Sequence, residues 1–228
     1  MASALTSVVV NAKAKHTATV LFLHGLGDSG SGWSFLAEEL SGLFPHIKWV
    51  LPNAPMLPIT LNQGMRMPAW FDLNGLDRAI TANQDEKGLL ASSVAVNSLI
   101  RKEIDSGIPS ERIVIGGFSQ GCALSLLVGL TSEYKFGGVV GCSGWLPLAE
   151  KFPAMASDAN KKTPVMMCHG DADPVVKYSF GRDSAGLLEK LGYNVKFNTY
   201  PGLVHSASPQ ELQDIASFIK ERLPPVEA

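Results

Sequence analysis

The sequence predicts an α/β fold in which a mostly parallel central sheet is covered by helices on both faces. Short apolar runs alternate with longer amphipathic stretches along all 228 residues, and such alternation implies crossover connections between parallel strands. In addition, a β-branched run leads into Gly-Phe-Ser-Gln-Gly at residues 117–121, and a helix-forming segment starts directly afterwards. No internal repeat or low-complexity linker is present, so we expect residues 1–228 to form a single domain.

Each expected element follows from its residue pattern. The strand candidates are short runs rich in Val, Ile and Leu. The helix candidates are longer, and in the longest Leu89, Val96 and Ile100 recur at helical spacing. Gly107 and Pro109 mark the end of that helix. The expected strands are residues 8–10, 19–23, 47–51, 113–117, 138–142, 164–168 and 195–200, and the expected helices are residues 33–40, 84–105, 120–130, 178–191 and 209–223.

Residues 52–73 do not fit this alternation. The segment holds four prolines and many apolar residues. Because proline removes a backbone donor and blocks helices, we predict a long ordered loop or a short lid. One interpretation is a packed crossover that covers the sheet, and the other is an apolar wall for a hydrophobic substrate. The residues that would form this wall are Leu57, Ile59, Leu61, Met65 and Trp70.

Composition excludes several classes of function. Hydrophobic residues make up 46% and charged residues 18% of the chain, which is typical of a globular protein. The net charge of −2 argues against a nucleic-acid partner, because phosphate binding needs a cationic surface. No run reaches the ~20 apolar residues of a membrane span, and the first residues lack a signal-peptide pattern. We therefore expect no integral membrane segment.

The cysteines indicate a reducing compartment. Cys122, Cys142 and Cys168 are odd in number and lie at or beside expected strand ends, so we predict buried free thiols and a cytoplasmic location. Neither paired-cysteine nor His-x-x-x-His spacing occurs, so we expect no metal and no cofactor. Cys122 lies three residues after Ser119, on the expected helix, and we interpret it as a packing residue.

Ser119 is the candidate nucleophile. The strand, the Gly-x-Ser-x-Gly turn and the helix together form the pattern of a nucleophile elbow. The turn should hold Ser119 in a strained backbone conformation, and a side chain at Gly117 or Gly121 would collide with the neighbouring helix or strand. The pentapeptide alone is weak evidence in a chain with 22 glycines, and a small serine in a tight turn is the plain alternative.

A serine hydroxyl needs a base to take its proton. In hydrolases with this elbow the chain order is serine, acid, histidine, and only His169 and His205 follow Ser119. His205 lies after the last expected strand and is the favoured base. His169 ends a strand, and we interpret it as a residue bonded to backbone.

The acid should come from the turn that follows His169. Asp171 and Asp173 both lie at the carboxyl end of a strand, where open parallel sheets place their sites. Pro174 restrains the turn and favours Asp173, while Asp171 would make turn hydrogen bonds. Asp171 stays open as the alternative acid.

Acyl transfer also needs two donors for the developing oxyanion. One is the backbone N–H of Gln120, the residue after the serine. The other is the N–H of Leu26, in a glycine-rich turn after an early strand. A phosphate-binding loop is the competing interpretation of that turn, but the glycine spacing fails and Asp28 would repel phosphate.

Seven sequence blocks then occur in one order between about residues 19 and 225. They are F-L-H-G-L-G-D, P-N-A-P, P-A-W-F-D, G-I-P-S-E-R-I-V-I-G-G-F-S-Q-G, S-G-W-L-P-L, C-H-G-D-A-D-P-V-V and Y-P-G-L-V-H-S. In these blocks the chain resembles the acyl-protein thioesterases, which are grouped with lysophospholipases and carboxylesterases in the α/β-hydrolase superfamily. The match is close to the eukaryotic cytosolic branch.

The resemblance implies an α/β-hydrolase fold, a catalytic triad, an oxyanion hole and an acyl channel beside residues 52–73. Two departures from the family stand out. Animal relatives carry a palmitoylated cysteine near the N-terminus, whereas this chain begins Met-Ala-Ser, and Cys122 stands where the family often has glycine. The implied site residues are Ser119, Asp173 and His205 for the triad, Leu26 and Gln120 for the oxyanion hole, and Trp145 for the channel.

These observations predict a serine hydrolase that cleaves long-chain acyl thioesters from proteins through an acyl-enzyme. Each CH₂ in an apolar groove contributes ~0.8 kcal/mol, so five or six could give about a thousandfold preference for long chains. A carboxylesterase or lysophospholipase acting on oxygen esters is the alternative, and a binding protein without turnover is a third hypothesis. Acylated proteins or lipid esters are the expected partners. Transient contact with a membrane surface, and the choice between a monomer and a weak homodimer, stay open.

Overall fold

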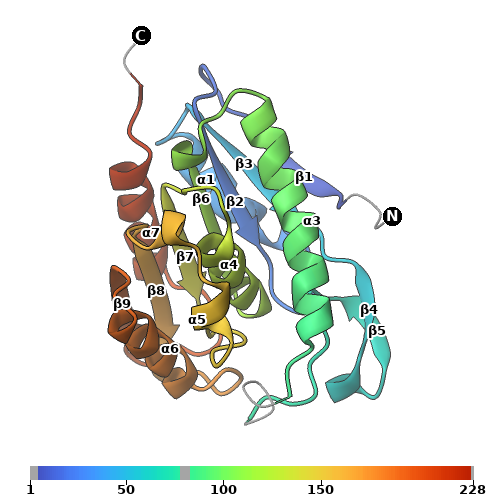
Figure 1. The fold of residues 1–228 in the computed structure, drawn as a ribbon. Helices are drawn as coiled ribbons and strands as arrows, with labels where there is room; N and C mark the ends of the chain where they lie inside the picture. The colour runs from blue at the N-terminus through green and yellow to red at the C-terminus, as the bar shows by residue number, and fades with distance from the viewer. Residues whose placement is uncertain (1–4, 78–82, 227–228) are drawn as a thin grey trace.

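The computed structural model describes residues 5–77 and 83–226. Seven strands form one sheet in the order β1-β3-β2-β6-β7-β8-β9, with helices on both faces (Figure 1). Only the pairing of β1 with β3 is antiparallel within this sheet, so the predicted α/β fold is confirmed. Its strands are β1 (Ser7–Val10), β2 (Ala18–Leu23), β3 (Ile47–Pro52), β6 (Ile113–Phe118), β7 (Gly138–Cys142), β8 (Val165–Gly170) and β9 (Val195–Tyr200).

The helices agree with the predicted ranges to within a few residues, except the short α5, which was not predicted. The helix expected at residues 33–40 starts one residue later, because Trp33 belongs to a 3-10 turn capped by Ser29. In the longest helix, Asp85 accepts a hydrogen bond from the N–H of Gly88 and fixes the start. The helices are α1 (Ser34–Ser41), α3 (Glu86–Asp105), α4 (Gln120–Thr131), α5 (Phe152–Met155), α6 (Tyr178–Lys190) and α7 (Pro209–Arg222), with 3-10 turns at Gly30–Trp33, Thr60–Asn62, Ser110–Arg112 and Asp158–Asn160.

The proline-rich segment differs from the predicted loop. It contains an antiparallel hairpin of β4 (Met56–Ile59) and β5 (Met65–Pro68), which lies outside the main sheet (Figure 1). Pro58 and Pro68 occupy alternate paired positions. In a two-stranded ribbon both strands are edges, so a proline nitrogen can face outward without losing a ladder hydrogen bond. The proline count therefore indicated a loop where the chain forms a ribbon.

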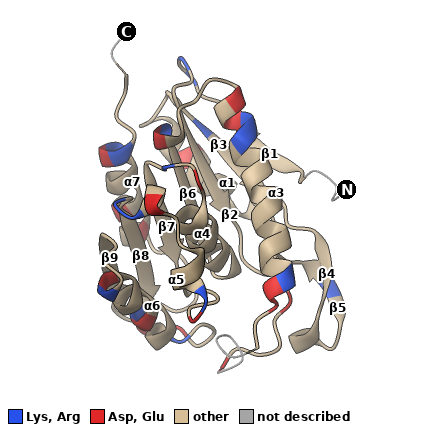
Figure 2. Ribbon diagram, viewed as in Figure 1, with Lys and Arg blue, Asp and Glu red and all other residues tan. Residues whose placement is uncertain are grey.

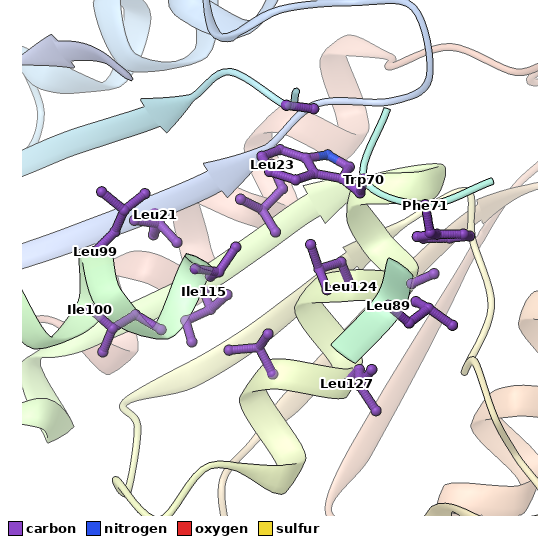
Figure 3. Close-up of a cluster of buried hydrophobic side chains, with 14 of the residues drawn as sticks. Leu21, Leu23, Trp70, Phe71, Leu89, Leu99, Ile100, Ile115, Leu124 and Leu127 are labelled. Carbon is purple, nitrogen blue, oxygen red and sulfur yellow. The ribbon is translucent and has the colours of Figure 1, made fainter. Parts of the chain in front are cut away.

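The core lies on both faces of the sheet. Helices α3, α4 and α6 cover one face, and α1 and α7 cover the other (Figure 1). In the first layer, Leu21 and Ile115 of the sheet belong to one buried cluster with Leu124 of α4 and Ile100 of α3 (Figure 3). Helix α4 is buried along almost its whole length, which explains why its sequence is apolar on all sides.

Charged residues are concentrated at the ends of helices and in loops, where blue and red are interspersed (Figure 2). The central strands β2, β6 and β7 carry no charged residue. Within the described part of the chain, no helix combines the length and the apolar content needed to cross a membrane.

Candidate active site

Ser119 occupies the sharp turn between β6 and α4. Its backbone has φ 55° and ψ −117°, a conformation that residues with a side chain rarely adopt. The turn is held in place because the Ser119 N–H donates to the carbonyl of Cys142 on β7, at 2.8 Å. The strained conformation expected for this serine is thus present, and it turns the side chain away from the helix that follows.

The two flanking glycines permit the close packing of this turn. A Cβ atom at Gly117 would lie 2.4 Å from the carbonyl carbon of Gly121. A Cβ atom at Gly121 would lie 2.1 Å from the carbonyl oxygen of Leu23, at the end of β2. Real Cβ atoms do not approach backbone so closely, so the predicted collision of a side chain at either position is confirmed.

The structure brings Ser119, His205 and Asp173 together from three separate loops. The His205 Nε2 lies 3.0 Å from the Ser119 Oγ, and the His205 Nδ1 lies 2.6 Å from Asp173 Oδ2. The ring of Phe118 packs against the imidazole of His205 with 4.7 Å between centroids. Because Nδ1–H donates to the carboxylate, Nε2 is free to accept the serine proton.

Asp173 is held by backbone as well as by histidine. Its Oδ1 accepts hydrogen bonds from the N–H groups of Val175 and Val176, at 2.8 and 2.9 Å. Burial alone would raise the pKa of Asp173, but hydrogen bonds from His169 and His205 and the Val175 N–H outweigh it and hold the pKa below its ordinary value. The side chain is therefore an ionised carboxylate within the fold.

The two alternative candidates lie elsewhere. Asp171 accepts a hydrogen bond from the Gly202 N–H at 2.7 Å, which is the turn contact expected of it. The His169 Nε2 donates to the carbonyl of Val176 at 2.9 Å and is 3.5 Å from Asp173 Oδ2. His169 thus contacts the back of the acid, while Ser119 is contacted by His205.

The two predicted oxyanion donors flank the serine. Neither the N–H of Leu26 nor that of Gln120 donates a hydrogen bond to any described residue. The Gln120 side chain is fully buried; its Oε1 accepts from the Trp70 N–H at 2.8 Å and its Nε2 donates to the carbonyl of Phe71 at 2.6 Å. Gln120 thus ties the start of α4 to the segment that follows the hairpin.

Trp70 lies in the core of the fold. Its ring is fully buried next to Leu23 (Figure 3), and its indole N–H donates to the carbonyl of His24 at 2.8 Å. The sequence placed Trp70 in a substrate wall, whereas the structure makes it a link between the hairpin and the turn that carries Leu26. An apolar ring beside a proline-rich segment fits either location, so sequence alone did not separate the two.

A cavity of about 290 Å³ opens beside Ser119, and its walls are mainly apolar. Of the predicted wall residues, Leu61 and Trp145 line it. Leu57, Ile59 and Met65 are outside the lining; Ile59 is buried, and Met65 is 65% exposed. Among the lining residues that sequence reasoning missed are two inside the 52–73 segment, one shortly after it and two shortly after Asp173. These are Asn62, Leu73, Leu76, Val175 and Val176.

Comparison with known proteins fits this geometry. The Phospholipase/Carboxylesterase family model matches residues 5–223. The chain belongs to this family. It is 50% identical to acyl-protein thioesterase 1 of Neurospora crassa, over 96% of this chain and 92% of that relative. It is 45% identical to the Schizosaccharomyces pombe protein of that name, over 96% of both chains. The crystal structure of Zea mays acyl-protein thioesterase 2 superposes with a TM-score of 0.84 at 34% identity, over 96% of this chain and 99% of that one.

The cysteine that follows the elbow was expected to be a packing residue. Cys122 is fully buried on α4, and burial raises the pKa of its thiol. Cβ atoms at Gly141 and Gly144 would lie 2.7 and 2.6 Å from its sulfur, so these glycines leave room for the cysteine side chain. Cys122 is thus a packing residue behind the elbow, and its protonated thiol is a poor nucleophile.

Among the described residues of this family member, Cys142, Cys168 and Glu211 form the one cluster of metal-ligand type. Their ligand atoms lie within 4.8 Å of one another, and all three are buried. A hydrogen bond with Cys168, together with burial, raises the pKa of the Cys142 thiol. In the fold as described, the Cys142 thiol is therefore held in its protonated form.

Proposed function

We propose that the protein is a serine hydrolase that cleaves long-chain acyl thioesters from proteins. The observation that carries this proposal is the continuous contact from Asp173 through His205 to the Ser119 hydroxyl, beside an apolar cavity. The similarity to acyl-protein thioesterases supports the substrate class.

In the proposed reaction, His205 Nε2 takes the proton of the Ser119 hydroxyl as the serine oxygen attacks the thioester carbonyl. Asp173 stabilises the imidazolium and holds the tautomer that leaves Nε2 free. The imidazolium then gives its proton to the departing cysteine sulfur. The fatty acyl group remains as an ester on Ser119. A water molecule, activated by the same imidazole, attacks that ester and releases the fatty acid.

The developing oxyanion would be bound by the N–H groups of Leu26 and Gln120. Gln120 is the first residue of α4, so the positive end of the helix dipole adds to its N–H. Both donors are unpaired among the described residues, which suits them to accept a charge that appears only in the transition state.

The cavity supplies the preference for acyl chains. Leu61, Leu73, Leu76 and Trp145 provide apolar surface, and each CH₂ buried there contributes ~0.8 kcal/mol. Chain length is therefore discriminated in the groove, while the triad supplies the chemistry common to all acyl groups.

Hydrolysis of oxygen esters is the second candidate function. The same residues could attack a carboxylic ester or a lysophospholipid, and the matched family is named for phospholipases and carboxylesterases. A thiolate leaves more readily than an alkoxide, because a cysteine thiol has a pKa near ~8.5. Thioesters should thus be the faster substrates at equal chain length.

The proposed setting is the cytoplasm, with acylated proteins as substrates. Cys122, Cys142 and Cys168 are free and buried, which agrees with a reducing compartment. Substrates of this kind lie at membranes, so transient contact with a membrane surface belongs to the proposal. We further propose a single domain that acts as a monomer or a weak homodimer.

The test compares acyl chains on the purified protein. Acetyl, octanoyl and palmitoyl groups are offered as thioesters and as oxygen esters on the same peptide, with Ser119→Ala as the control. We expect kcat/KM to rise with chain length, to be higher for thioesters, and to vanish in Ser119→Ala. Equal rates for acetyl and palmitoyl thioesters would remove the long-chain claim and leave a general esterase.

A further inference from the structure

His24 is a buried histidine at the end of β2 that the proposed reaction does not use. It is fully buried, and both ring nitrogens are bonded to backbone. Its Nδ1 lies 2.6 Å from the carbonyl oxygen of Gly25, and its Nε2 lies 3.0 Å from the backbone nitrogen of Ala54. The ring therefore connects the turn at residues 24–28 to the chain that follows β3.

These contacts define the tautomer of His24. A backbone N–H can only donate, so Nε2 accepts the hydrogen bond from Ala54. Nδ1 then carries the proton and donates it to the Gly25 carbonyl. Burial lowers the pKa of His24, which keeps the ring neutral. A neutral ring with one donor and one acceptor matches both of its backbone partners.

The bond to Gly25 acts on one particular peptide group. The carbonyl of Gly25 and the N–H of Leu26 belong to the same planar unit, and in a trans peptide they point in opposite directions. A hydrogen bond that fixes the carbonyl therefore fixes the N–H as well. The same carbonyl also accepts the N–H of Asp28 across the turn, at 3.3 Å, so His24 supplies the shorter of its two hydrogen bonds.

This peptide lies close to the nucleophile. A Cβ atom at Gly25 would be 3.3 Å from the Cβ of Ser119, and Leu26 lines the cavity with Ser119. The other side of the turn is anchored, since the carbonyl of His24 accepts the indole N–H of Trp70. The peptide that carries the Leu26 N–H is thus fixed from its buried side.

We propose that His24 is a positioning residue for the oxyanion hole: its Nδ1–H holds the Gly25–Leu26 peptide so that the Leu26 N–H faces the reacting carbonyl. The assignment rests on the proposed hydrolase function. His24 acts through the peptide and touches no reacting atom. Its role is to keep one donor aligned before substrate arrives, which is the preorganisation that makes such donors effective.

Two substitutions separate the two nitrogens of the ring. His24→Asn keeps an N–H donor near the position of Nδ1 and loses the acceptor for Ala54. His24→Gln keeps an acceptor near the position of Nε2 and loses the donor for Gly25. His46→Gln is the matched control for stability, because His46 is also buried and bonded to backbone, through Nε2 to the carbonyl of Leu223 at 2.8 Å.

The measurements are kcat and KM for a palmitoyl thioester, the midpoint of urea unfolding, and two binding constants. One is for a long-chain trifluoromethyl ketone, which forms an oxyanion on Ser119, and the other is for the matching unreactive alcohol. We expect His24→Gln to lower kcat by about 10²-fold, the cost of a lost oxyanion donor, with KM nearly unchanged. The ketone should lose affinity by a similar factor and the alcohol should not. His24→Asn should lose less than about tenfold.

Equal losses of kcat in His24→Asn and His24→Gln would overturn the assignment. So would a ketone affinity that falls no more than the alcohol affinity. A loss of kcat in His46→Gln that follows its loss of stability would also overturn it, because lowered stability alone would then explain a lower kcat. The wild-type protein and Ser119→Ala are assayed in parallel. If the wild-type protein shows no Ser119-dependent hydrolysis, the proposed function fails first; if it does, a normal His24→Gln rejects this inference alone.

Discussion

Asp171 and Asp173 show how two identical side chains, two residues apart, acquire different roles. Asp173 is buried, with one oxygen on His205 and the other on two backbone N–H groups. Asp171 is exposed and accepts from the Gly202 N–H alone among the contacts described. The turn that starts after β8 thus points one carboxylate inward to the histidine and the other outward.

The first prediction separates these two carboxylates. Asp173→Asn should lower kcat by about 10⁴-fold, because an amide can hold the imidazole in the wrong tautomer and no longer stabilises its charge. Asp171→Asn should change kcat by less than about threefold, since its amide oxygen can still accept from Gly202. Steady-state rates with a palmitoyl thioester are the measurement. A larger loss in Asp171→Asn would reverse our assignment of the acid.

Glu211 in the first turn of α7 presents a different case. It is fully buried, and the thiols of Cys142 and Cys168 lie within 4.8 Å of its carboxyl group. Burial raises its pKa from 4.5 to about 7. Between these values the folded protein binds more protons than the unfolded chain does. Stability contributed by the neutral carboxyl is therefore present at low pH and is lost as pH rises through about 7.

The second prediction follows from this direction of the pH dependence of stability. Glu211→Gln, which mimics the protonated carboxyl, should raise the free energy of unfolding at pH 8 by up to about 3 kcal/mol and change it little at pH 5. Glu39→Gln on the exposed face of α1 is the control and should do neither. Urea unfolding at both pH values measures the difference. A Glu211→Gln variant that is no more stable than the wild type at pH 8 would contradict the raised pKa.

At the scale of elements, the elbow between β6 and α4 was predictable because a strand, a Gly-x-Ser-x-Gly turn and a helix follow one another directly in the sequence. A Cβ atom at Gly117 would lie 2.4 Å from the carbonyl carbon of Gly121 within the turn, and one at Gly121 would lie 2.1 Å from the Leu23 carbonyl of the adjacent β2. The β4–β5 hairpin was not predictable in the same way. Its prolines predict a loop. They are compatible with strands only because the hairpin lies outside the main sheet, where both strands are edges.

The third prediction concerns the wall next to that hairpin. Leu61→Asp should lower kcat/KM for a palmitoyl thioester by about tenfold or more, because a charge replaces apolar contact with the chain. Acetyl thioester hydrolysis should be nearly unaffected. Met65→Asp is the matched control, since Met65 is 65% exposed and lies outside the lining of the cavity. Equal effects of the two substitutions would show that the acyl chain takes another path.

At the scale of the whole molecule, the sheet gathers residues that are far apart in the chain. The turn at residues 24–28, Ser119, Asp173 and His205 follow β2, β6, β8 and β9, whose carboxyl ends meet at one edge of a parallel sheet. The alternation of elements and the order serine, acid, histidine therefore directed the prediction to this edge of the sheet, while the choice of Asp173 over Asp171 depended on Pro174.

The sequence could not distinguish residues of the hydrophobic core from residues that line the cavity. Trp70, Ile59 and Leu61 are apolar residues of one segment, yet the first two are buried and only the third lines the cavity. The role of His24 could not be predicted from the sequence either. Its ring is bonded to the backbone of Gly25 and of Ala54, and Ala54 lies after the next strand. Such roles depend on packing between distant segments.

The most direct test maps covalent labelling by a long-chain alkyl fluorophosphonate while palmitoyl thioester hydrolysis is followed in the same sample. We predict that peptide mass spectrometry will find the label on Ser119 and that activity will fall in proportion to its occupancy. Hydrolysis that persists when Ser119 is fully modified, or inactivation that follows labelling of another residue, would contradict the account.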